Sequence, residues 1–186
     1  MGLNMRTGRW GFSLLMLAVV AAMTTGLDAV AAQPSETLAT SAGARVELGA
    51  GPVAVKLAPA AAGKALSARV AAIGQDRKVY LVVRGLGTDQ PPETIYQIYL
   101  GLPSGVAPNP DGDYYVGSLN FFNAVKREAD ATRSDPRFLS FDVTDRLKAL
   151  HSRKSLGDNT TVTIIPAGTP RAAAKPVISE IALVEQ

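Results

Sequence analysis

The chain has 186 residues, 47% of them hydrophobic and 19% charged, with 19 basic and 16 acidic side chains and a formal net charge of +3. This excess of base is too small to predict binding to nucleic acid or to an anionic membrane. The sequence contains no cysteine, which excludes disulfides, thiolate catalysis and thiolate ligands for soft metals.

The first 32 residues have the pattern of an export signal. Arg6 and Arg9 precede an uncharged apolar run at 10–27, and small residues follow it. An uncleaved membrane anchor is the alternative, because a run of this length is near the lower limit for spanning a bilayer. Gly26 and Asp28 interrupt the run where an anchor would continue. This favours a cleaved signal peptide at 1–32 and a periplasmic or secreted protein, with no membrane contact beyond the signal.

The remaining chain is predicted to hold one domain. Residues 33–44 are small, polar and without periodicity, which indicates a flexible leader. Residues 45–186 are enough to bury a sizeable core, and they read as short apolar segments separated by Gly, Pro and Asp. Strands are predicted at 45–48, 53–57, 68–73, 79–85, 94–102, 114–122, 138–143, 161–166 and 177–185.

Alternation indicates which faces of these strands are buried. Tyr96, Ile98 and Leu100 share one side of their strand, and that side is expected to face the core. The segment 79–83 is almost continuously apolar, which is typical of a strand covered on both faces.

One short helix is predicted after the strand at 138–143. Thr144 is expected to cap a helix from Asp145 to about residue 151, with Leu147 and Leu150 facing inward. Loops are predicted at 103–113 and 126–137. Many strands with a single helix favour an all-β fold, an antiparallel β-sandwich of about seven to nine strands.

Several of these segments resemble a known family when taken in order. They are VYLVVRGL, PPETIYQIYLGLP, YYVGSLNFF, FLSFDVTDRL, TVTIIPAG and KPVISEIALVEQ, which span about the last hundred residues. Together they are similar to the C-terminal β-sandwich domain of bacterial tyrosinases and polyphenol oxidases. The resemblance implies a domain that can cover a copper site and hold an oxidase latent. The family's copper ions are held by six histidines in a separate helical domain, whereas this chain has one histidine.

No residue pattern predicts a catalytic, cofactor or metal site. His151 is a lone imidazole near a helix end, so a structural role is favoured over metal ligation. Asp111 and Asp113 flank a glycine in NPDGDYY, where a turn is favoured over a calcium loop because the further acidic ligand of an EF-hand is missing.

Tyr114 and Tyr115 are the candidate partner contacts. They follow the loop at 103–113, and adjacent strand residues face opposite ways, so at least one of them is expected to be exposed. Tyrosine is a common anchor at protein interfaces.

The sequence therefore predicts a non-catalytic exported domain without a cofactor. The favoured function is to bind, and to shield or stabilise, a separately encoded tyrosinase-like copper oxidase. The alternatives are an envelope domain that binds carbohydrate or another small ligand, and a purely structural domain.

Overall fold

The computed structural model describes residues 35–41, 43, 45–61, 64–122, 124–125, 138–157 and 159–186. The expected signal at 1–32 and the expected loop at 126–137 lie outside these residues. Within the described ranges, no helix combines the length and the hydropathy needed to cross a membrane.

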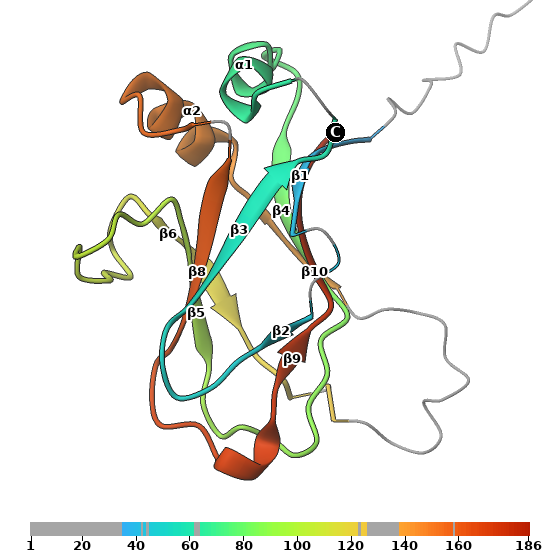
Figure 1. Cartoon of the computed structure of the whole chain (residues 1–186), viewed down its shortest axis with the longest axis vertical. Coiled ribbons are helices and arrows are strands. Elements are labelled where there is room, and N and C mark those ends of the chain that lie inside the picture. The colour runs from blue at the N-terminus through green and yellow to red at the C-terminus, as the bar shows by residue number, and fades with distance from the viewer. Residues whose placement is uncertain are drawn as a thin grey trace, which may run out of the picture. The chain divides into compact units, whose positions relative to one another are not determined.

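The described part of the chain is mostly β-structure (Figure 1). Its elements are β1 (Glu36–Thr40), β2 (Val46–Glu47), β3 (Val53–Pro59), α1 (Leu66–Ala71), β4 (Val79–Arg84), β5 (Tyr96–Leu100), β6 (Tyr115–Leu119), β7 (Phe138–Asp142), α2 (Thr144–Ser152), β8 (Thr160–Pro166), the 3-10 helix η2 (Ala172–Ala174), β9 (Val177–Ile178) and β10 (Glu180–Glu185).

Eight strands form one antiparallel sheet in the order β6-β5-β8-β3-β1-β10-β4-β7, and β2 pairs with β9 separately. The two end strands approach each other. A Cβ atom added to Gly117 of β6 would lie 2.6 Å from the ring of Phe141 in β7. The sheet therefore curls until it is nearly closed, which confirms the predicted all-β antiparallel class.

The predicted core faces are confirmed. Tyr96, Ile98 and Leu100 are fully buried in the main core. Leu81 belongs to the same core, whereas Val82 is buried in a second cluster with Ala182 and Val184. Strand β4 is thus covered on both faces, as its continuous apolar sequence predicts.

The expected flexible leader at 33–44 is wrong for residues 36–40, which form β1. This strand lies between β3 and β10 in the sheet, and its Leu38 and Ala39 are fully buried. The side chain of Arg69 donates to the carbonyl oxygens of Thr37 and Leu38. Pairing with distant strands therefore orders this segment, although its own composition does not predict a strand.

The strand predicted at 68–73 is also wrong, because α1 occupies residues 66–71. Leu66 and Val70 are buried four residues apart, which is the spacing of one helical face, and Ile73 continues that side. Two α-helices are therefore described where the sequence predicted one.

The one predicted helix is confirmed as α2, but its cap differs. Thr144 is the first helical residue, and Val143 takes the N-cap position without a side-chain hydrogen bond. The carboxylate of Asp142 accepts hydrogen bonds from the Thr144 N–H, at 3.1 Å, and from the Thr144 hydroxyl, at 2.7 Å. Asp142 thus supplies the acceptor that was expected from Thr144.

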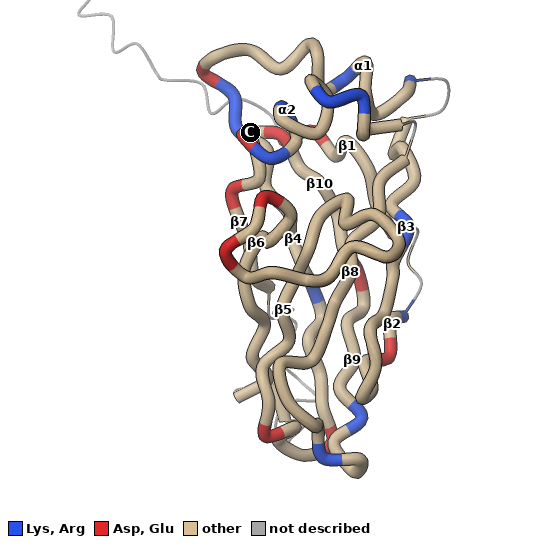
Figure 2. Tube along the Cα trace, turned by 90° about the vertical axis from the view of Figure 1, so that its left-hand side faces the viewer, with Lys and Arg blue, Asp and Glu red and all other residues tan. Residues whose placement is uncertain are grey.

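The helices α1 and α2 lie together at one end of the domain, and η2 lies at the opposite end with the β2-β9 pair nearby (Figure 1). Acidic and basic residues are interspersed at both ends rather than separated by sign (Figure 2). The end that carries η2 holds the two pockets described next.

Candidate functional site

The tyrosines singled out by the sequence are both half-buried. Tyr114 packs at the edge of the main core. The Tyr115 ring lies edge-on to the buried Tyr99, with centroids 5.6 Å apart, and its hydroxyl is 2.8 Å from Ser118 Oγ. Tyr115 therefore covers another tyrosine and has its hydroxyl partnered, and a role of either residue in partner contact stays a prediction.

The other polar candidates lie in a turn, an ion pair and a helix end. The Asn109 side chain accepts from the Asp111 N–H, as in a turn, and the Asp113 carboxylate pairs with Arg153 at 2.6 Å. His151 lies in the last turn of α2. Among the described residues no three His, Cys, Asp or Glu side chains are grouped so that they could hold a metal ion.

An apolar groove lies at the end of the domain that carries η2. It has a volume of about 510 Å³, and we call it the Phe122 groove. It is lined by residues from three loops, namely Pro91, Pro92, Glu93, Thr94, Ile95, Asn120, Phe121, Phe122, Ala167 and Gly168.

Two adjacent phenylalanines at the end of β6 build this groove. Phe121 turns inward, where it is buried and meets the Tyr96 ring edge-on at a centroid distance of 5.7 Å. Phe122 turns outward and is 86% exposed, the largest value among the exposed large apolar side chains described. Ile95, in the same groove, is 46% exposed. An apolar patch of this kind is typical of a protein contact site.

The floor and one rim of the groove are held by backbone contacts. The Ala167 N–H donates to the Ile95 carbonyl at 2.9 Å, and the Arg171 N–H donates to the Pro92 carbonyl at 3.0 Å. The Arg171 guanidinium also pairs with Glu93. Glu93 has a φ of 60°, in the left-handed region that a residue with a side chain seldom adopts. Non-glycine residues in that region are concentrated at functional sites.

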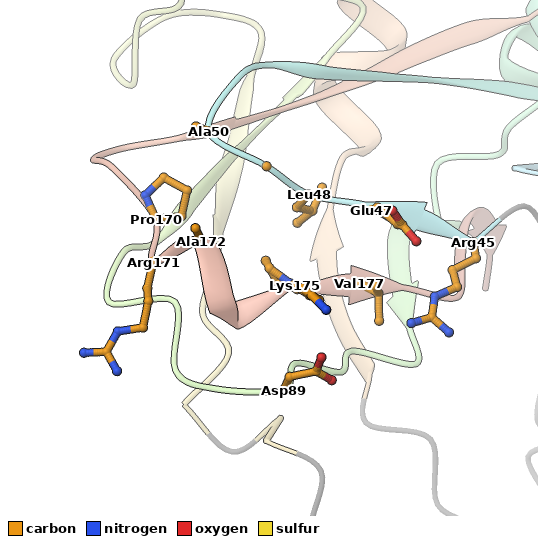
Figure 3. A pocket seen from close by; sticks show the side chains of 12 residues that line it. Arg45, Glu47, Leu48, Ala50, Asp89, Pro170, Arg171, Ala172, Lys175 and Val177 are labelled. Carbon is orange, nitrogen blue, oxygen red and sulfur yellow. The ribbon is translucent and has the colours of Figure 1, made fainter.

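A second pocket lies on the other side of Arg171, and we call it the charged pocket. Its volume is about 520 Å³. Figure 3 shows the residues that line it, which include Arg45, Glu47, Leu48, Asp89, Arg171 and Lys175. In this view Lys175 lies between Leu48 and Asp89, whereas the Arg171 side chain points outward.

Three segments meet to form the charged pocket. The Leu48 N–H donates to the Pro176 carbonyl at 2.9 Å, and the Asp89 N–H donates to the Ala174 carbonyl at 2.8 Å. The buried Thr88 hydroxyl reaches that same carbonyl at 2.7 Å. These bonds fix the pocket walls relative to one another.

Sequence reasoning missed Phe122 and Lys175. The Phe121-Phe122 pair carries the same signal as the tyrosine pair, because neighbours on a strand face opposite sides. This alternation predicts that one of the two rings is exposed, but it does not identify which one. No signal in the sequence marks the conformation of Lys175.

The fold is similar to parts of solved polyphenol oxidases. Latent apple tyrosinase aligns with a TM-score of 0.50 and 15% identity, over 78% of this chain and 28% of that chain. Latent aurone synthase, a polyphenol oxidase, aligns with a TM-score of 0.47 and 15% identity, over 75% of this chain and 25% of that one. The chain thus spans about a quarter of these enzymes, in their C-terminal region, and the likeness is one of fold.

No curated protein matches the sequence. Because a family model described as a domain of unknown function (DUF7868) matches residues 34–186, the chain belongs to that family.

Proposed function

We propose that this protein is a non-catalytic, exported accessory domain that binds a separately encoded tyrosinase-type copper oxidase and shields its active site. The observation that carries the proposal is Phe122, which is 86% exposed beside an apolar groove. A free phenylalanine at the edge of a groove is available to enter a pocket in a partner, and buried aromatic anchors dominate the binding energy of interfaces.

The fold likeness supports the choice of partner. The aligned apple tyrosinase is a latent form, and the domain aligns with 28% of that chain. In the proposal, the domain does in trans what an attached domain would do in cis. Removing the covalent link changes the effective concentration of the domain but leaves the contact surface unchanged.

The test is inhibition of a tyrosinase-type oxidase encoded in the same genome. Phenol oxidation is measured while the domain is titrated in, and binding is measured separately by calorimetry. We expect the unchanged protein to bind and to lower the oxidation rate. The substitution Phe122→Ala should weaken binding by at least about tenfold, as removal of an interface anchor does.

Phe138→Ala is the matched control. Phe138 is also an exposed phenylalanine, at 62%, but it begins β7 and does not line the Phe122 groove. Its loss should leave both binding and inhibition unchanged. Equal effects of the two substitutions, or an oxidase rate that the domain does not alter, would contradict the proposal.

A further inference from the structure

Lys175 has a backbone conformation that lysine rarely adopts. It follows η2 with φ 46° and ψ 55°, in the left-handed region, where glycine avoids the steric penalty of a Cβ atom. The next residue is Pro176, which further restricts the conformations that suit position 175. Because residues other than glycine in this region are concentrated at functional sites, the surroundings of the Lys175 side chain bear on function.

The described structure gives that side chain no internal use. No hydrogen bond or ion pair joins the Lys175 ammonium to any side chain in the described ranges, and the same is true of Arg45. Both cations line the charged pocket. Arg171, the third cation there, is already paired with Glu93 and points outward (Figure 3). Two cations without an ion-pair partner among the described side chains therefore line one cavity, and both can form charge-assisted hydrogen bonds to an anionic group.

The pocket also offers an acceptor. Glu47 lines it without a partner among the described side chains, whereas Asp89, on the opposite side (Figure 3), is already engaged in an interaction. A carboxylate accepts hydrogen bonds from hydroxyl groups and repels a second anion, so it selects for a ligand that carries hydroxyls as well as its one negative group. The volume of about 520 Å³ is within the range of small-molecule sites.

We propose that the charged pocket binds a small hydroxylated carboxylate, the chemistry of a sugar acid. Lys175 and Arg45 hold the carboxylate of the ligand, and Glu47 accepts a hydrogen bond from one of its hydroxyls. This site is separate from the Phe122 groove, and its ligand would be recognised whether or not an oxidase is bound.

The test is calorimetric titration of the full-length chain at low salt with three probes, namely glucuronate, glucose and acetate. We expect glucuronate to bind, and glucose and acetate to bind at least about tenfold more weakly, because each lacks one of the two recognised groups. Raising the salt concentration should weaken glucuronate binding.

Two substitutions at position 175 separate charge from backbone conformation. Lys175→Gln removes the charge and retains the strained backbone, and Lys175→Gly removes both. We expect each to weaken glucuronate binding by about tenfold, and only Lys175→Gly to raise the Tm, by about 2 °C.

Lys154→Gly is the matched control, since Lys154 has φ 56° and lies after α2, outside the pocket. It should raise the Tm by a similar amount and leave binding unchanged. No heat from glucuronate, equal binding of all three probes, or retained binding by Lys175→Gln would overturn the proposal. A lack of oxidase inhibition would not affect it, because that result concerns the Phe122 groove.

Discussion

Asp142 joins three parts of the fold through one carboxylate. It accepts both hydrogen bonds from Thr144 at the start of α2, and its second oxygen lies 3.0 Å from Lys78 Nζ. The Thr144 hydroxyl in turn accepts from the Val79 N–H at 2.9 Å, so the helix start is tied to β4. The two bonds from Thr144, with Lys78 after them, lower the pKa of Asp142 from 3.8 to about 2.

This lowered pKa predicts a specific pH dependence of stability. A carboxyl whose pKa is lower in the folded state stabilises the fold above its unfolded pKa, and the contribution disappears as the pH falls towards 2. The side chain is 42% exposed, so solvent screening reduces the contribution to about 1 kcal/mol at pH 7. Urea unfolding should show Asp142→Asn to be less stable by this amount at pH 7, and the gap should narrow between about pH 4 and pH 2. A gap that is independent of pH would show that the charge of Asp142 is not involved.

At the scale of single elements, β1 is stabilised by contacts from a residue in another element, Arg69 of α1. Arg69 in α1 donates to two carbonyls of this strand, at 3.1 and 3.4 Å, and pairs with Glu36 at 2.5 Å. The Arg69 side chain is only 8% exposed, and its loss would leave the carbonyl of the buried residue Leu38 without this donor.

Arg69→Ala is therefore expected to destabilise the domain by about 1–3 kcal/mol in urea unfolding. Arg84→Ala is the comparison, because Arg84 also forms an ion pair, with Glu180, but its side chain is more exposed, at 39%. That change should cost no more than about 1 kcal/mol. If both substitutions had the same small effect, β1 would not depend on Arg69.

The sequence predicts an element well when the residues of that element themselves determine its structure, and poorly when contacts with distant residues determine it. The alternation of Tyr96, Ile98 and Leu100 predicts β5 because the signal lies within the strand itself. Residues 36–40 contain one large apolar side chain, Leu38, and become a strand by pairing with β10 and β3. Such pairing has no trace within the segment that adopts it.

The candidate sites show the same contrast between what local sequence predicts and what only distant contacts determine. Two adjacent phenylalanines predict that one ring is outside, but packing against Tyr96 decides that it is Phe122. The charged pocket gathers Arg45, Asp89 and Lys175, which are far apart in sequence. Only the closed fold brings them together, so no spacing rule could have identified them.

At the scale of the whole domain, closure of the sheet depends on a glycine, Gly117, which has no side chain to obstruct the Phe141 ring. Strands β6 and β7 are the ends of the sheet, and the Phe141 ring fills the space beside Gly117. Phe141 would have to move to admit a Cβ atom there, because contacts as short as 2.6 Å are not tolerated.

Gly117→Ala should consequently destabilise the domain by about 1–3 kcal/mol, the usual effect of overpacking. Gly51→Ala is the control, since nothing lies within 4 Å of a Cβ at that position. Thermal unfolding monitored by circular dichroism measures both. Addition of Phe141→Leu to Gly117→Ala should recover part of the loss, and an additive double variant would count against this contact.

The position of β10 has a consequence for the order in which this protein assembles. Strand β10 lies in the interior of the sheet, between β1 and β4, and contacts such as Ser41 with Ile181 link residues 140 apart. Contacts of such high sequence separation slow folding, because a long loop must close before they form. The central sheet cannot be completed until residues 180–185 have been synthesised. Loss of residues 180–185 would therefore remove a central strand and separate β1 from β4, rather than fray an edge of the sheet.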